Sequence, residues 1–449
     1  TGQVNGQIYM GVWGGNSGTL NVDKFDNSGT ITASNNDKGI FFEGKNTNIK
    51  TFNNSGTITS NSIAIDVANN SNINSFTNSG FISAGKGVNI GQGTMTNFTN
   101  ANSGTIQGSE AGVLVNTKID TFTNKGFINS SGSGYWSNGV WVSGNTDIKT
   151  FVNDGIIQGD SGAIRSSGGT IENFINNGTM NGGSAAVFMQ NSIIKTLENK
   201  GTINSTSDID WGGAIKLENG GTIENIINTG TINSVVSGIH VSYGKFGTLT
   251  IKDGGVVYGK TAGIWVNQWQ TLGELYIDGT NLKKDGTVSG IYSDNHGIAL
   301  DVGSSTSKIE LKNGGIIQGK VNGIRLEKAA SLSGEIILSG KGSRVEGGSG
   351  AGISNESGKI EGSIKVEDGA TVTSSSGQAI SNSGSGSITG GITVSGENTK
   401  LEGNIVNTDS ASIGSDIKIE GGAKVEGGLV NEGEGSITGS ITIDKNSQL

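Results

Sequence analysis

The chain has 449 residues, with 79 glycines, no proline, no cysteine, two histidines and a formal net charge of −9. Apolar residues make up 32% of it, and together with glycine they are enough to form a core, so wholesale disorder is excluded. The lack of cysteine excludes disulfides, thiolate zinc sites and thiol catalysis. The balance of 30 basic against 39 acidic side chains argues against a nucleic-acid surface, which needs a basic stripe.

Residues 1–24 precede the repeats and are interpreted as an N-terminal cap. A stack of strands has to cover its open edge, because unpaired backbone groups there would otherwise pair with other chains. The apolar residues that would do this are Tyr9, Met10, Val12 and Trp13.

A repeated phrase dominates the sequence from residue 25 onward. Its clearest copy is FNNSGTI at residues 52–58, and the other copies keep the pattern Phe-x-Asn-x-Gly-Thr-Ile with small edits. We name the first residue of the phrase the anchor. The anchors are Phe25, Phe52, Phe76, Phe98, Phe122, Phe151, Phe174, Leu197 and Ile226, with fainter copies at Ile251, Ile277 and Leu311. Their spacing of 22 to 34 residues indicates a repeat protein with a constant skeleton and variable loops.

Each repeat contains three short apolar segments. The first ends at the anchor, the second is the Gly-Thr-Ile step, and the third has the pattern Gly-Ile-x-Val, as in residues 238–241. Period-two alternation of β-branched residues between clusters of Gly, Asn and Ser predicts strands. Three short strands per repeat predict an all-β fold, a right-handed parallel β-helix (solenoid) of about 17 rungs, with neighbouring rungs about 4.8 Å apart.

Two columns of like residues support stacking of the rungs in register. Nine successive repeats place an asparagine two residues after the anchor, namely Asn27, Asn54, Asn78, Asn100, Asn124, Asn153, Asn176, Asn199 and Asn228. Asparagine tolerates sharp corners, and stacked amides can hydrogen-bond from rung to rung. Seven anchors are phenylalanines, and we expect their rings to stack in one inner corner of the tube.

The pattern changes after about residue 330. The phrase IEGSIKV at residues 360–366 recurs from residues 388, 413 and 437, while phenylalanine and the asparagine ladder disappear. We expect isoleucine and valine to fill the core there. The repeats are therefore divided into Asn/Phe rungs at 25–330 and Gly/Ser/Glu-rich rungs at 331–449 that continue the same solenoid.

The Phe-x-Asn-x-Gly-Thr-Ile repeat resembles the passenger domains of Gram-negative autotransporters, especially the asparagine-rich adhesin-like ones. The resemblance covers essentially the whole chain, although its motif encodes a fold more than an activity. It implies a passenger exported through the outer membrane to the bacterial cell surface, with its own outer-membrane β-barrel as a partner outside this sequence. The lack of cysteine agrees, because such passengers cross the outer membrane unfolded. Adhesion is the commonest role in that family, and toxins and proteases also use the scaffold.

One segment matches a catalytic motif. Residues 159–162, Gly-Asp-Ser-Gly, match the nucleophile sequence of trypsin-like proteases, including autotransporter proteases. Those enzymes place their histidine and aspartate before the serine, on a separate domain. Here both histidines, His240 and His296, follow the serine, so the motif is interpreted as a turn that leads into a strand.

Polysaccharide lyases and hydrolases also use parallel β-helices, with clustered carboxylates plus basic residues or calcium. The nearest cluster is Asp208 and Asp210, which in an extended segment would point the same way and share a cation. The alternative is a solvated loop. Strand alternation points His240 outward, so we expect a surface histidine. No cofactor and no resident metal are expected.

Three rungs have longer connections between the second and third segments. These are residues 129–138, 204–212 and 289–296, which we place at the same corner of the tube. Insertions in repeat proteins tend to lie on the binding face, and exposed aromatic rings stack on sugars or anchor protein contacts. The aromatic and acidic candidates for binding are Tyr135, Trp136, Asp208, Asp210, Trp211 and Tyr292, with Trp269 at a different corner. The alternative is that these rings fold down and cover apolar edges of the solenoid.

The sequence thus predicts a non-enzymatic adhesin that binds a host-cell surface protein or glycan, or the same passenger on a neighbouring cell. A polysaccharide-binding or polysaccharide-cleaving β-helix is the first alternative, and a toxin-like passenger is the second.

Overall fold

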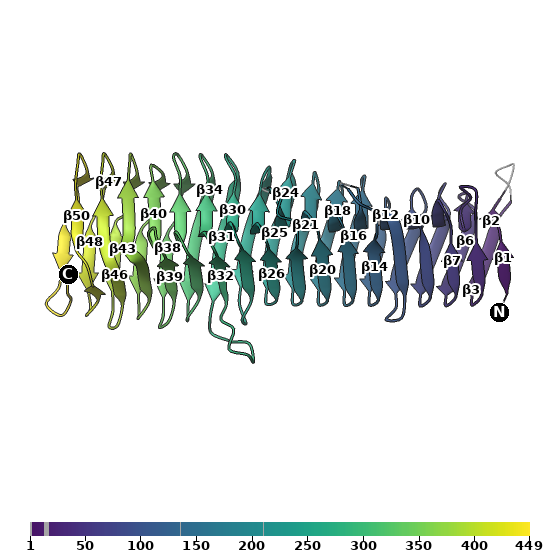
Figure 1. The fold of residues 1–449 in the computed structure, drawn as a ribbon, viewed down its shortest axis with the longest axis horizontal. Helices are drawn as coiled ribbons and strands as arrows, with labels where there is room; N and C mark the ends of the chain where they lie inside the picture. Colours follow the sequence, from purple (N-terminus) through teal and green to yellow (C-terminus); the bar gives the residue numbers. More distant parts are fainter. Residues whose placement is uncertain (1, 13–17, 135, 210) are drawn as a thin grey trace. The chain divides into compact units, whose positions relative to one another are not determined.

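The computed structural model describes residues 2–12, 18–134, 136–209 and 211–449. The chain forms two compact units, Thr1–Ser207 with Ala214–Ile223, and Asp208–Gly213 with Glu224–Leu449. Both are built of parallel strands stacked rung on rung (Figure 1), and the solenoid has about 17 turns. The predicted right-handed parallel β-helix is therefore confirmed. Across these described ranges there is no helix long and apolar enough to cross a membrane.

Each rung of the first unit has up to three strands, named here by their order within the rung. The first strands are β3 (Leu20–Asn27), β6 (Thr47–Asn54), β9 (Asn72–Asn78), β11 (Thr94–Asn100), β13 (Ile119–Asn124), β16 (Asp147–Asn153), β19 (Thr170–Asn176) and β22 (Ile193–Asn199). The second strands are β1 (Gln3–Asn5), β4 (Thr30–Thr32), β7 (Thr57–Thr59), β14 (Phe127–Ser130), β17 (Ile156–Gly159), β20 (Thr179–Gly182) and β23 (Thr202–Ser205). The third strands are β2 (Ile8–Gly11), β5 (Ile40–Glu43), β8 (Ile63–Val67), β15 (Asn138–Ser143), β18 (Gly162–Ser167), β21 (Ala185–Gln190) and β24 (Gly213–Glu218). Two long strands, β10 (Phe81–Ile90) and β12 (Thr105–Val115), each span the positions of both the second and the third strand of their rung.

The second unit repeats this plan. Its first strands are β25 (Gly221–Asn228), β28 (Gly244–Ile251), β31 (Thr271–Asp278) and β34 (Ser305–Lys312), followed by the split pairs β37 (Ser331–Leu332) and β38 (Ile336–Ser339), β41 (Lys359–Ile360) and β42 (Ile364–Glu367), β44 (Ser387–Ile388) and β45 (Ile392–Ser395), β47 (Ser412–Ile413) and β48 (Ile417–Glu420), and β51 (Ser436–Ile437) and β52 (Ile441–Ile443). Its second strands are β26 (Thr231–Ser234), β29 (Val256–Gly259), β32 (Gly290–Ser293), β35 (Ile316–Gly319), β39 (Arg344–Gly347) and β49 (Lys424–Val425). Its third strands are β27 (Ser237–Val241), β30 (Ala262–Val266), β33 (His296–Leu300), β36 (Ile324–Leu326), β40 (Ile353–Glu356) and β50 (Leu429–Asn431), while β43 (Thr371–Ser383) and β46 (Lys400–Asn407) combine both positions.

Phenylalanine rings fill one inner corner of the first unit. Strand pairing aligns each anchor with the next, for example Phe98 with Phe122 and Phe122 with Phe151. From Phe25 to Phe151 the rings are stacked with centroids 4.4–5.2 Å apart, and the last ring, Phe174, meets Phe151 edge-on at 4.7 Å. Pairing then places Leu197 next to Phe174. The stack buries large apolar area at the place where the chain turns from the first to the second strand.

The asparagine ladder lies beside this stack. From Asn27 to Asn199 each side-chain Nδ2 donates to Oδ1 of the asparagine one rung on, at 2.7–2.9 Å. The amides also cap backbone carbonyls at the corner, as when Asn124 Nδ2 donates to Gly126 O and Ile156 O. Asn228 belongs to the second unit, where its Nδ2 donates to Val256 O at 3.0 Å.

The fainter anchors lie in a different column from the one predicted. The backbone N–H of Lys252 donates to Asn228 O, the contact that the residue after each ladder asparagine makes in the first unit, so Ile251 occupies the ladder position. Ile277 and Leu311 follow it in register, while the true anchor column continues as Leu249, Leu275 and Ile309. The prediction was wrong by two residues because an aliphatic residue replaces the amide and mimics an anchor.

The ladder two residues after the anchor is absent after residue 330, as predicted, since Leu338 and Val366 occupy its column. A second asparagine ladder at another corner was not predicted. This second ladder joins the ends of the third strands, with Nδ2-to-Oδ1 distances of 2.7–2.8 Å along Asn355, Asn382, Asn407 and Asn431. Its amides cap carbonyls of the next corner, such as Gly358 O. The first ladder lies at the corner after the first strand, and the second lies at the corner after the third strand. The Phe-x-Asn pattern describes only the first of these corners, so it did not reveal the second ladder.

The N-terminal residues extend the stack. β1 pairs with β4 and β2 with β5, so residues 3–11 supply the second and third strands of a rung. Tyr9 meets Phe41 edge-on with ring centroids 5.8 Å apart, and its hydroxyl donates to Glu43 at 2.9 Å. Trp13, predicted to contribute to the cap, lies outside the described residues.

Candidate functional site

A column of outward-facing side chains, many of them aromatic or basic, runs along the third strands. It is formed by the variable residue of the Gly-Ile-x-Val pattern, which points away from the core while its neighbours point inward. In the first unit the column contains Phe41, Asp66, Asn89, Leu114, Trp141, Arg165, Phe188 and Lys216. In the second it contains His240, Trp265, Ala299 and Arg325. This column was not predicted, although the third segments of successive repeats, when aligned, place these residues at one position.

Trp136 covers the column in the first unit. Its ring stacks on Trp141 with centroids 5.2 Å apart and lies 4.8 Å from the guanidinium carbon of Arg165. Arg165 is 2% exposed and also lies 4.9 Å from the ring of Phe188, and its Nη2 donates to Gln190 at 2.6 Å. Trp136 itself remains 55% exposed. One face of its indole is therefore held by stacking and cation–π contact while the other faces solvent. Its neighbour Tyr135 lies outside the described residues.

In the second unit Trp211 stacks on the column of the third strands, as Trp136 does in the first. Its ring stacks on Trp265 at 5.7 Å and His240 at 6.3 Å, and His240 Nδ1 lies 3.1 Å from Trp211 O. Trp265 Nε1 donates to Asp301 at 2.7 Å, and burial raises the pKa of that carboxyl. Trp211 is 53% exposed, whereas His240 is completely buried. The expectation of a surface histidine was therefore wrong, because strand alternation gives the direction of a side chain but not what lies over it.

The predicted acidic pair cannot be placed as a pair. Asp208 is exposed and precedes the exposed Ile209, and Asp210 lies outside the described residues. Within the described ranges no group of three or more His, Asp or Glu side chains is arranged to hold a metal ion. The Gly-Asp-Ser-Gly motif is a turn between β17 and β18, as predicted, and Ser161 in it is buried.

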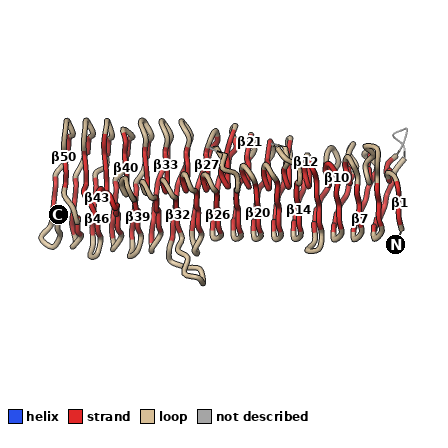
Figure 2. Tube along the Cα trace, in the orientation of Figure 1, coloured by secondary structure: helices blue, strands red, loops and turns tan. Residues whose placement is uncertain are grey.

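Tyr292 does not lie in an enlarged loop. Residues 290–293 form β32, in register with β29 and β35, so only two residues separate it from β33. The insertion instead connects β31 to β32 at residues 279–289, the projecting loop in Figure 2. The loop 289–296 was misassigned because the true second strand starts with Gly-Ile rather than Gly-Thr. Tyr292 is half-buried, which raises the pKa of its hydroxyl, and this hydroxyl donates to Val288 O at 3.3 Å.

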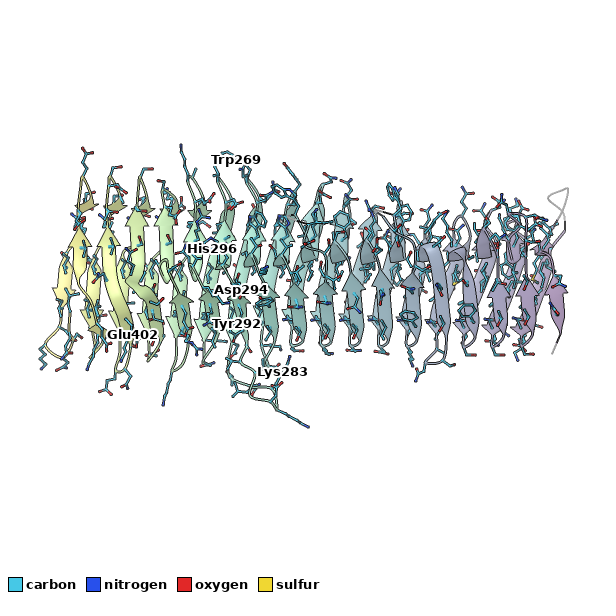
Figure 3. The ribbon with its side chains drawn as sticks, viewed as in Figure 1. Trp269, Lys283, Tyr292, Asp294, His296 and Glu402 are labelled. Atoms are coloured by element: carbon cyan, nitrogen blue, oxygen red, sulfur yellow. The ribbon has the colours of Figure 1, made fainter. Side chains whose placement is uncertain are left out.

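Trp269 is separate from these residues. Figure 3 shows it at the opposite edge of the second unit from Lys283 of the projecting loop, with Tyr292 and Asp294 between them. Trp269 is 71% exposed in a turn with φ +63°, and a Cβ atom at Gly303 would lie 2.3 Å from its indole. Gly303 has φ +70°, so glycine is needed there for both space and conformation. The indole of Trp269 packs against Gly303, and the ring contacts of Trp136 and Trp211 do not include it.

His296 lies near Tyr292 at the start of β33. Burial, followed by the positive charge of Arg325, lowers its pKa from the ordinary 6.5 to about 4. Between these values only the unfolded chain is protonated, so the contribution of His296 to stability is complete above pH 6.5 and is lost as the pH falls toward 4.

We therefore expect the NMR ring-proton signal of His296 to titrate with a midpoint about pH 4. The variant His296→Gln identifies the signal by its disappearance, and the remaining signal from His240 is the internal comparison. A midpoint close to the ordinary 6.5 would contradict the partly buried position of the ring.

A groove of about 480 Å³ lies on the first unit, between the second and third strands. It is polar and is lined by Asn129, Ser130, Ser131, Gly132, Gln158, Gly159, Asp160, Asn181, Gly182, Gly183, Asn204 and Thr206. The connection that begins with Ser131 and Gly132 borders it, and the backbone N–H of Gly134 donates to Asp160 Oδ2 at 3.0 Å. The sequence singled out this loop for its aromatic residues and did not identify the amide side chains in the groove.

Comparison of the chain with protein-family models, curated proteins and solved structures gave no match.

Proposed function

We propose that the protein is a non-enzymatic adhesin displayed on a bacterial cell surface as the passenger of an autotransporter. Its partner is a host-cell surface protein or glycan, or the same passenger on a neighbouring cell. The observation that carries the proposal is that each unit presents a tryptophan, Trp136 or Trp211, that is more than half exposed yet stacked on the third strands.

Such residues suit attachment because tryptophan is the residue most enriched in binding hot spots. A ring already held by its neighbours loses little conformational freedom on binding, so more of its contact energy appears as affinity. The solenoid presents these rings on a packed core, and many copies on one cell would strengthen weak single contacts. The cysteine-free composition further supports export across the outer membrane as an unfolded chain.

We expect purified wild-type protein on beads to bind host cells or to clump, and the double variant Trp136→Ala/Trp211→Ala to bind at least about tenfold more weakly. The matched control is Trp269→Ala, which removes an exposed indole outside both stacks and should leave binding unchanged. Far-ultraviolet circular dichroism verifies that the variants remain β-structured. Undiminished binding by the double variant, or wild-type protein that neither binds cells nor clumps, would refute the proposal.

A further inference from the structure

A column of amide side chains on the second strands lines the groove on the first unit. Asn129, Gln158, Asn181 and Asn204 occupy the same position on four successive second strands and are neighbours in the strand register. All four line the groove. Neighbouring rungs are about 4.8 Å apart, so the column offers one amide for about each sugar-sized step along the stack.

These amides differ from the inner ladder in their hydrogen bonding. The inner asparagines are linked at 2.7–2.9 Å, whereas in the outer column the contact between Asn204 Nδ2 and Asn181 Oδ1 is 3.5 Å long. Asn129 Oδ1 is buried without a hydrogen-bond partner among the described residues. Gln158 is exposed, and its longer side chain interrupts the run of asparagines. The exposed amide of Gln158, in the middle of the column, therefore offers both a donor and an acceptor to a ligand.

Glycine backbone supplies the other part of the groove. A Cβ atom at Gly183 would lie 1.9 Å from Asp160 O, and one at Gly182 would lie 2.0 Å from Ala185 O. Close backbone packing therefore excludes side chains at these positions and keeps the groove open. Its shape comes from the stacked rungs themselves, so it exists before any ligand binds.

The charge of the groove selects the class of ligand. Asp160 is the one charged side chain among its lining residues, and none of them is lysine or arginine. An acidic polysaccharide would meet a carboxylate without a compensating cation, whereas neutral hydroxyl groups can pair with amides as donors and acceptors. We infer that this groove binds a neutral oligosaccharide that lies along the stack of rungs, one sugar to about one rung. This inference deepens the proposed adhesin function by naming the ligand class of one surface.

The test is calorimetric titration of the full chain with hexamers of β-1,4-linked glucose, of N-acetylglucosamine and of mannose, and with a galacturonate hexamer as the acidic comparison. We expect at least one neutral hexamer to bind and the acidic one to bind more weakly. The variant Gln158→Ala/Asn181→Ala should weaken neutral binding by about tenfold, the loss expected for two hydrogen bonds. The matched control Asn74→Ala removes an exposed amide from a first strand, outside the groove, and should bind as the wild type does.

Failure of any neutral hexamer to bind, preference for the acidic hexamer, or equal affinity of the groove variant and wild type would overturn the inference. Cell attachment by the same variants separates this failure from failure of the proposed function. If cells bind through Trp136 and Trp211 while no hexamer binds, the adhesin proposal stands and the glycan groove does not. If a hexamer binds in the groove but cells do not attach, the glycan groove stands and the adhesin proposal does not.

Discussion

The variant Phe122→Ala should lower the free energy of unfolding by about 3–5 kcal/mol, the usual cost of emptying a buried phenylalanine site. Phe122 is completely buried, and its ring is stacked between Phe98 at 4.4 Å and Phe151 at 4.6 Å. Truncation removes both contacts at once, and the backbone of a stacked rung cannot collapse to fill the space. Urea unfolding followed by circular dichroism measures the change, and hydrogen exchange locates it in the rung.

The matched control is Phe122→Leu. Leucine already occupies the equivalent position as Leu197, next to Phe174, so this variant should cost less than half as much as alanine. Equal losses for the two variants would show that ring stacking rather than cavity formation sets the energy. A loss below about 1 kcal/mol for alanine would contradict the packed corner.

The variant Asn124→Ala should cost about 2–4 kcal/mol, because it leaves several buried groups without partners at once. Asn124 accepts from Asn100 Nδ2 at 2.9 Å and donates to Asn153 Oδ1 at 2.8 Å, and it also caps two backbone carbonyls. We expect faster hydrogen exchange in the adjoining rungs, since each rung of a solenoid is stabilised mainly by its neighbours.

An exposed asparagine provides the comparison for this variant. Asn177 donates to Asp154 at 2.7 Å on the surface, and Asn177→Ala should change stability by less than about 0.5 kcal/mol. If Asn124→Ala and Asn177→Ala had the same effect, the inner ladder would contribute no more than an ordinary surface contact.

The columns of like residues were predictable because they repeat locally. Phe52 and Asn54 occur in one short phrase, and the phrase alone assigns the anchor and ladder positions in each copy up to Asn199. The anchor column was misassigned from Ile251 onward, because an aliphatic residue there occupies the ladder position in place of asparagine. The ladder that begins at Asn355 was also not predicted. An asparagine can stabilise the corner after the first strand or the corner after the third, and only the order of the strands shows which corner it occupies.

The candidate sites depended on information that no single repeat contains. Trp211 was identified as an unusual residue, but its stacking on Trp265 depends on how a loop returns to a strand more than 50 residues later. Tyr292 was assigned to a loop because the insertion in its rung was placed one connection too late. The groove amides were not recognised because Asn129 and Gln158 are ordinary surface residues until register brings them side by side.

The amino-acid pattern by itself determined the parallel β-helix, its strands, and the phenylalanine and asparagine columns of the first unit. These features follow from period-two alternation and from a repeated phrase, which act over a few residues and recur in every rung. Only the tertiary structure decided which outward side chains are buried, which tryptophans remain exposed, and where the groove lies. Those properties arise between rungs, because the return of a variable loop to the strands depends on backbone packing rather than on the repeat.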